Sequence, residues 1–162
     1  MMNMITPPPL LALQQRLVDR LLTVLPEDAL LWDPEDTIPY ECDGLAAFKQ
    51  MPLAVALPQT ENQVVGSLKV CHELQIPVVP RGAGTGLSGG AMPLENSLVL
   101  SLAKLKKIVH IDPIARIATV QPGVRNLAIS EAVAHLGLYY APDPSSQIAC
   151  SIGGNVSENS GG

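Results

Sequence analysis

The chain of 162 residues has few charged side chains and few cysteines, and each scarcity excludes a class of protein. Charged residues make up 15% of the sequence, against about 25% in an average soluble domain, so we expect part of the apolar surface to face a partner. The net charge is −5, which gives a nucleic-acid role no electrostatic support. The cysteines, Cys42, Cys71 and Cys150, lie far apart and are odd in number, which argues against a disulfide framework or a zinc site.

Long hydrophobic runs and targeting signals are also missing. The first ten residues, MMNMITPPPL, contain neither a basic region nor an apolar run of the length that secretion or a membrane span requires. Together with the scattered cysteines, this predicts a cytoplasmic protein without a membrane span of its own. No G-x-S-x-G sequence is present, so Ser145 and Ser146 do not indicate a hydrolase nucleophile.

Glycine, in contrast, is concentrated in one segment. From Pro80 to Gly90 the sequence is PRGAGTGLSGG, with five glycines in nine residues, directly after the apolar run Ile76 to Val79. Because glycine loses more backbone entropy on folding than other residues, a folded loop of this composition needs an offsetting contact. That contact is most often between backbone N–H groups and anionic oxygens. The loop is therefore a candidate phosphate-binding loop, and a flexible surface linker is the alternative.

Two better-known glycine motifs do not fit this loop. Gly84, Gly86 and Gly89 satisfy G-x-G-x-x-G, but the Rossmann fingerprint must continue into a helix. Here Pro93 and Asn96 follow, and then a strand-like run begins. A Walker loop requires a Lys-Ser or Lys-Thr pair after the glycines, and the sequence has none there.

Hydrophobic periodicity predicts a mixed α and β chain. A helix is expected over residues 10–25, and Thr60 and Gln63 form the capping box of a second helix, which lies between strands at 53–57 and 76–79. These elements predict a parallel β-α-β unit with the glycine loop at the carboxyl end of its second strand, where ligands bind in α/β sheets. Residues 26–51 receive no assignment, and only turns are predicted after residue 137. The remaining expected elements are strands at 97–102, 108–111 and 116–120, the last two forming a hairpin, and a helix at 125–136 that Gly137 ends.

Two later segments form a pattern with the glycine loop: QPGV at 121–124 and APDPSSQIACSIGGNVSENSGG at 141–162. The three segments together resemble the flavin-binding region of the vanillyl-alcohol oxidase and p-cresol methylhydroxylase (PCMH) superfamily. The most similar branch holds bacterial glycolate oxidase flavin subunits and the D-lactate and D-2-hydroxyglutarate dehydrogenases. The resemblance implies an α+β, PCMH-type FAD-binding domain at 51–162, built from a β-α-β subdomain and part of a second α+β subdomain, after a helical lead-in at 1–50. Because the sequence breaks off inside a glycine-rich segment, we expect the front part of a longer protein.

The resemblance also implies which residues hold FAD, through main-chain N–H groups of two glycine-rich turns and through Ser and Thr hydroxyls. For Arg81, the alternative is an ion pair with a carboxylate. Relatives that bind flavin covalently commonly use a His in the first loop, and this loop has none, so FAD is expected to be non-covalent. The implied cofactor residues are Pro80, Arg81, Gly82, Ala83, Gly84, Thr85, Gly86, Ser88, Gly89, Gly90, Pro122, Gly123, Asp143, Ser145, Ser146, Ile152, Gly153, Gly154, Asn155, Glu158 and Asn159.

The activity implied by the resemblance is FAD-dependent oxidation of a small 2-hydroxy acid, such as glycolate or D-lactate, to the 2-oxo acid. The implied partners are a second flavin-domain subunit and an iron–sulfur subunit, and any membrane association would come through them. We assign no metal site and no catalytic residue, since His72, His110 and His135 are scattered and are expected to be structural or solvent-facing. Two alternatives stay open: a module that binds FAD or a nucleotide without turnover, and a remnant that does not fold alone.

Overall fold

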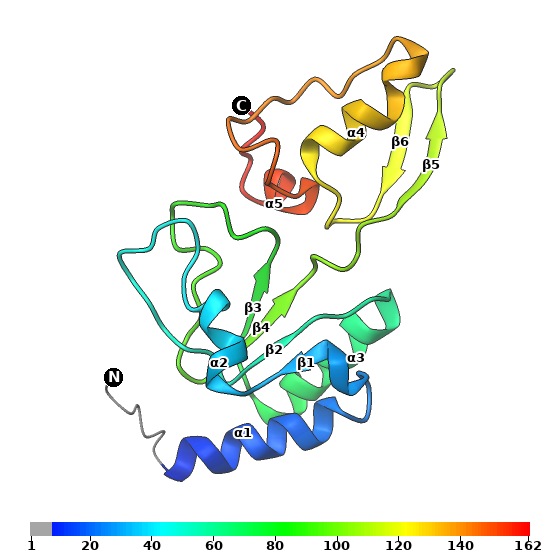
Figure 1. The fold of residues 1–162 in the computed structure, drawn as a ribbon. Helices are drawn as coiled ribbons and strands as arrows, with labels where there is room; N and C mark the ends of the chain where they lie inside the picture. The colour runs from blue at the N-terminus through cyan, green and yellow to red at the C-terminus, as the bar shows by residue number, and fades with distance from the viewer. Residues whose placement is uncertain (1–7) are drawn as a thin grey trace.

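The computed structural model describes residues 8–162 and arranges them in two lobes (Figure 1). The first lobe contains a four-stranded sheet in the order β1-β2-β4-β3. β4 pairs in parallel with both β2 and β3, whereas β1 is antiparallel to β2. Every residue of β2 and β4 is buried, as expected for strands inside a covered sheet. The four strands span Leu30–Leu31 (β1), Ala54–Ala56 (β2), Val78–Arg81 (β3) and Leu98–Ser101 (β4).

Two long helices, α1 (Pro8–Leu21) and α3 (Glu61–Leu74), pack against each other and against this sheet. The capping box predicted for α3 is present: the Thr60 hydroxyl accepts from the Gln63 N–H at 3.3 Å. The Gln63 side chain accepts the N–H of Gln59, one residue before the cap. Within residues 8–162, no helix combines the length and apolar composition needed to cross a bilayer.

The second lobe is a two-stranded hairpin covered by a helix (Figure 1). The predicted turn at Asp112 is confirmed, since its carboxylate accepts the N–H groups of Ile114 and Ala115 at 3.0 and 2.9 Å. Gly137 has a φ of 69° and ends the helical region, as its position predicts. The elements of this lobe are β5 (Ile108–Asp112), β6 (Ile117–Val120), α4 (Asn126–Val133) and a 3-10 turn, η3 (Ala134–Leu136).

Three features differ from the sequence-based expectation. First, β4 lies between β2 and β3, so the two strands of the predicted β-α-β unit are parallel but not neighbours. Second, residues 26–51 contribute β1 and a short helix, α2 (Pro34–Thr37), with 3-10 turns η1 (Glu27–Ala29) and η2 (Ile38–Tyr40). Third, the prediction of turns alone after residue 137 is wrong, because a helix, α5 (Ile152–Ser157), forms there.

Candidate functional site

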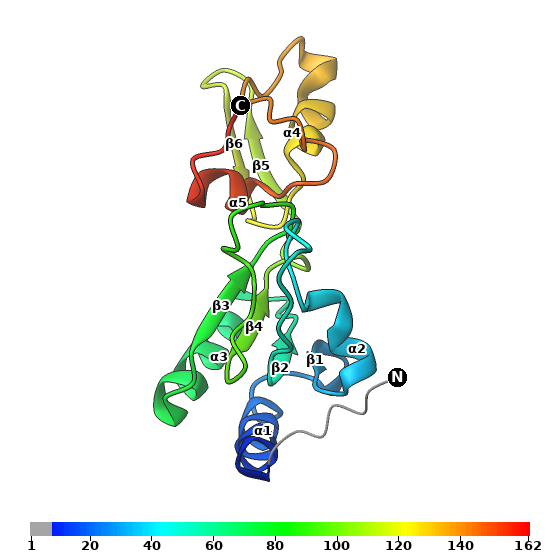
Figure 2. The same cartoon turned by 90° about the vertical axis from the view of Figure 1, so that its left-hand side faces the viewer.

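The glycine loop and the second glycine-rich segment are distant in sequence and meet between the lobes. The loop leaves the end of β3 and lies beside α5 in both views (Figures 1 and 2). A Cβ atom on Gly82 would collide with Ser151 Oγ, and one on Gly86 would lie 3.1 Å from Glu158 Oε2. The structure therefore places the two segments against each other, as one cofactor site would require.

The loop backbone carries a row of unused hydrogen-bond donors. In the structure of residues 8–162, no backbone N–H from residue 83 to residue 90 donates a hydrogen bond to the protein. Gly84 and Gly89 have φ values of +70° and +77°, which favour glycine and turn the backbone sharply. Unpaired N–H groups along such a turn form an anion-binding surface. The other predicted residues of this loop are half-buried or exposed: Pro80, Ala83, Thr85, Ser88 and Gly90.

The Arg81 side chain links the start of the loop to the backbone of neighbouring segments. Its guanidinium donates to the carbonyl oxygens of Cys42 and Ala91, at 2.6 and 3.4 Å, and lies 5.5 Å from the centre of the Tyr40 ring. Both hydrogen bonds use Nη1, and Arg81 forms no ion pair with a carboxylate among the described residues. Contact of its remaining N–H groups with a phosphate of the cofactor stays a prediction. A Cβ atom on Gly84 would lie 2.5 Å from Arg81 Cζ, so the guanidinium occupies the space that glycine leaves open.

The segment from Tyr40 to Gly44 forms a third side of the site, which sequence reasoning missed. Besides the Arg81 bond to Cys42, the Gly44 N–H donates to the Gly86 carbonyl at 2.9 Å. The available sequence signal was an Asp-Gly pair, which indicates a turn but not what the turn contacts. This segment joins the lead-in to the glycine loop.

The second glycine-rich segment is held by the QPGV turn. The N–H groups of Ile152 and Gly153 donate to the carbonyls of Val124 and Pro122, at 2.8 and 2.9 Å. Gly153 lies against Pro122, since an added Cβ would be 2.8 Å from the proline Cβ. These contacts fix where α5 begins relative to the second lobe. Gly154, the next residue of α5, is half-buried.

Three buried polar side chains complete this end of the site: Asn126, Ser151 and Asn155. Asn155 donates to the side-chain oxygen of Asn126 at 3.0 Å, and Asn126 donates to the Pro142 carbonyl at 2.9 Å. Ser151 is 5% exposed, and its hydroxyl oxygen has no hydrogen-bond partner in residues 8–162. A buried hydroxyl beside Gly82 is free to bind a ligand oxygen. Ser151 was not among the predicted site residues, although it directly precedes Ile152.

Three other predicted residues, Asp143, Ser145 and Ser146, lie in the turn-rich segment ahead of Ser151. The Ser146 carbonyl accepts the N–H groups of Ala149 and Cys150, each at 2.8 Å, and Asp143 accepts from the Gln147 side chain. Among the hydrogen bonds of residues 8–162, none joins the segment from Asp143 to Ser146 to the glycine loop. Ser145 is exposed, and Asn159 is exposed with a φ of 50°.

The structure defines an α+β domain in which unpaired backbone donors, a buried hydroxyl and two glycine-rich segments lie together. The chain belongs to the FAD-binding domain family, whose model matches residues 52–162. The FAD-binding fold predicted from the three glycine-containing segments is thereby confirmed, and FAD is the cofactor of the family.

Known proteins agree with this assignment. The chain is 64% identical over 133 residues to the glycolate oxidase subunit GlcD of Escherichia coli (strain K12), which covers 82% of the chain and 27% of that protein. It is 45% identical over 123 residues to the glycolate oxidase subunit GlcD of Bacillus subtilis (strain 168), covering 76% and 26%. A solved structure of p-cresol methylhydroxylase with substrate bound is 26% identical, with a TM-score of 0.69, and covers 78% and 25%. The chain thus spans about a quarter of the length of these relatives.

Proposed function

We propose that this chain forms the FAD-holding part of an oxidoreductase that oxidises a small 2-hydroxy acid, such as glycolate or D-lactate, to the 2-oxo acid. The observation that carries the proposal is the row of unused N–H donors at 83–90, packed against α5. Relatives named as glycolate oxidase subunits and as a D-lactate dehydrogenase support the substrate class. FAD supplies the oxidising chemistry when bound, because it accepts the hydrogen and electrons that leave the substrate.

The residues present fit FAD in charge and in donor type. The diphosphate is an anion whose oxygens only accept hydrogen bonds, and the loop from Ala83 to Gly90 offers N–H groups that only donate. The Ser151 hydroxyl adds a donor beside Gly82. We infer that Asn155 holds α5 in place for this contact through its bond to Asn126. The other cofactor residues expected from the sequence, Glu158 at the loop and the turn from Asp143 to Ser146 included, belong to the same proposal.

The mode of attachment and the setting of the enzyme are proposed with it. The segment from Pro80 to Gly90 contains no His, which supports non-covalent FAD. The relatives are named as subunits of glycolate oxidase, which supports the presence of a partner subunit. We propose that the partners are a second flavin-domain subunit and an iron–sulfur subunit, in a cytoplasmic assembly. His72, His110 and His135 are all exposed and lie on α3, β5 and η3, outside the glycine loop. We therefore assign no catalytic base to this chain.

Two experiments test the proposal. Titration of the chain with FAD, followed by flavin fluorescence, is expected to show saturable binding at one FAD per chain; an absence of binding would contradict the FAD assignment. In a second experiment, this chain replaces its aligned region in the Escherichia coli relative, and extracts are assayed for glycolate-dependent dye reduction. Retained reduction supports the substrate class, and loss of activity in a chimera that still holds FAD would contradict it.

A further inference from the structure

Asp43 is a buried acid with half of its carboxylate unused. It is 6% exposed, and its Oδ1 atom accepts the Leu45 N–H at 2.8 Å in a local turn. Its Oδ2 atom has no hydrogen-bond partner in the described chain. Leaving a buried polar atom without a partner costs free energy, so such an atom in a native protein needs an explanation.

The position of Asp43 is fixed by its two neighbours, which are both bound to the glycine loop. Cys42 accepts from Arg81 at 2.6 Å, and Gly44 donates to Gly86 at 2.9 Å. Asp43 is therefore held between two points of the loop. Within residues 8–162, the buried side-chain atoms without partners are Asp43 Oδ2 and Ser151 Oγ, and both border this loop. Their shared location indicates a ligand rather than two independent packing faults.

The chemistry of the missing partner follows from the carboxylate. An ionised carboxylate only accepts hydrogen bonds, so a phosphate group, which also only accepts, would be repelled. Arg81 does not fill the role, because its guanidinium donates to Cys42 and Ala91 and forms no ion pair with Asp43 in the described chain. The partner must bring a donor: a sugar or ribityl hydroxyl, a ring N–H or an amine. FAD carries such groups on both sides of its diphosphate.

We propose that Asp43 is a cofactor-recognition residue whose Oδ2 accepts a hydrogen bond from a donor group of FAD. The inference rests on the proposed function, since it needs FAD in the glycine loop. It assigns to the Tyr40–Gly44 segment a direct role in binding, in addition to its contacts with the loop.

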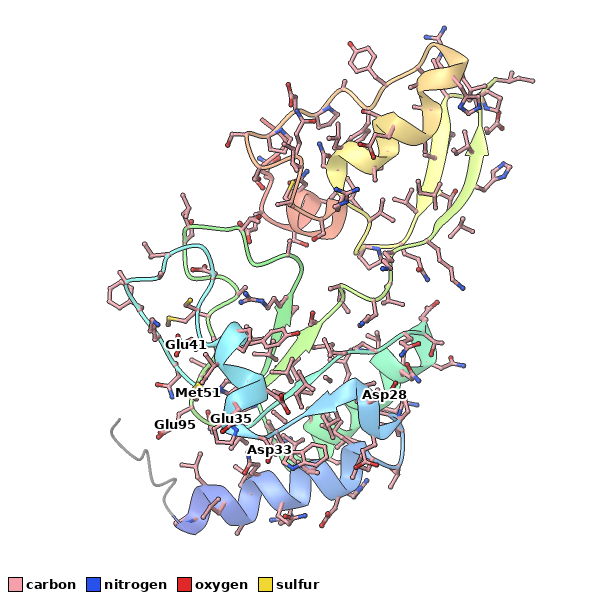
Figure 3. All side chains as sticks on the ribbon, viewed as in Figure 1. Asp28, Asp33, Glu35, Glu41, Met51 and Glu95 are labelled. Carbon is pink, nitrogen blue, oxygen red and sulfur yellow. The ribbon has the colours of Figure 1, made fainter. Side chains whose placement is uncertain are left out.

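Asp43→Asn tests the proposal with little change in shape. The asparagine oxygen can still accept the Leu45 N–H, while an NH₂ donor replaces the free acceptor. We expect FAD affinity, measured by flavin fluorescence, to fall at least about tenfold, the scale of one lost hydrogen bond to a charged group. Asp33→Asn is the matched control, because Asp33 is an exposed acid beside α2, away from the glycine loop (Figure 3), and should leave affinity unchanged.

Separate titrations with ADP and with riboflavin identify which half of FAD carries the donor. Asp43→Asn should lower the affinity for the compound that contains the donor group and leave the affinity for the other unchanged. Asp43→Ser is a second variant. The serine hydroxyl can still accept the Leu45 N–H, but there is no second oxygen for FAD, so FAD affinity should fall by the same factor. Unchanged FAD affinity in either folded variant would overturn the inference while the proposed function stands. Failure of the parent chain to bind FAD would overturn both.

Discussion

The glycine loop makes a quantitative prediction at Gly84, where an added methyl group should act through Arg81. The residue has a φ of +70°, and its Cβ position lies 2.5 Å from Arg81 Cζ. An alanine there must tolerate a left-handed backbone, which costs roughly 1–2 kcal/mol. It must also displace the guanidinium from the Cys42 carbonyl, at a further cost of about 1.5–3 kcal/mol for a hydrogen bond to a charged group.

Gly89 supplies a control with the same backbone strain and no collision. Its φ is +77°, and nothing lies within 4 Å of its Cβ position. Gly89→Ala should therefore cost only the roughly 1–2 kcal/mol of strain. The difference in the free energy of unfolding between Gly84→Ala and Gly89→Ala therefore measures the cost of displacing Arg81, provided that both substitutions affect the unfolded chain equally.

Urea unfolding followed by circular dichroism measures these costs, and a double-mutant cycle assigns them. In an Arg81→Ala background the guanidinium is absent, so Gly84→Ala should cost no more than Gly89→Ala does. FAD affinity, measured in parallel, should fall more for Gly84→Ala than for Gly89→Ala. Only Gly84→Ala displaces the Arg81 guanidinium from the Cys42 carbonyl. Equal unfolding costs for Gly84→Ala and Gly89→Ala, or a Gly84→Ala cost that Arg81→Ala leaves unchanged, would refute the linking role of Arg81.

Four further predictions follow from other features of the chain. Gly123→Ala should lower the urea midpoint more than Gly84→Ala does, because its Cβ would collide with the Leu102 carbonyl, and a backbone oxygen yields less readily than a side chain; an equal or smaller loss would contradict this. Burial raises the pKa of the Cys71 thiol to about 11, so a thiol reagent at pH 8 should label half-buried Cys42 before Cys71, as peptide mapping would show. The same shift predicts stability that is complete below about pH 8.5, the usual thiol pKa, and that declines as pH rises towards 11; Cys71→Ala should flatten this decline. Finally, acid denaturation should release intact FAD, and mass spectrometry that finds a flavin adduct on the polypeptide would refute non-covalent binding.

Local chemistry explains which parts of the fold were readable from the sequence. The cap at Thr60, the turn at Asp112 and the stop at Gly137 each depend on residues adjacent in the chain, and the structure confirms all three. The glycine loop was equally readable, because its composition has few uses other than close approach of a ligand. Periodicity does not encode strand order, so the insertion of β4 between its neighbours could not be predicted.

The contacts of residues 26–51 could not be predicted from the sequence for a related reason. β1 has only two residues, too few to show an alternating pattern, and it exists because Leu30 and Leu31 pair with β2. The contacts that Cys42 and Gly44 make with the loop depend on a carbonyl and an N–H, which every residue type supplies except for the missing N–H of proline. Main-chain contacts leave no signature in the identity of the residue.

α5 shows how tertiary contacts outweigh local propensity. Gly153 and Gly154 each disfavour a helix by roughly 1 kcal/mol relative to alanine, which is why only a turn was predicted there. The structure offsets this by burying Ile152 in the core of the second lobe, by binding Gly153 to the Pro122 carbonyl and by pairing Asn155 with Asn126. Gly153, one of the glycines that weaken the helix, lets α5 approach Pro122 closely, and Gly82 in the loop leaves room for Ser151 at the start of the helix. The glycine that made a helix unexpected is therefore also the one that lets α5 pack against Pro122, beside the proposed cofactor site.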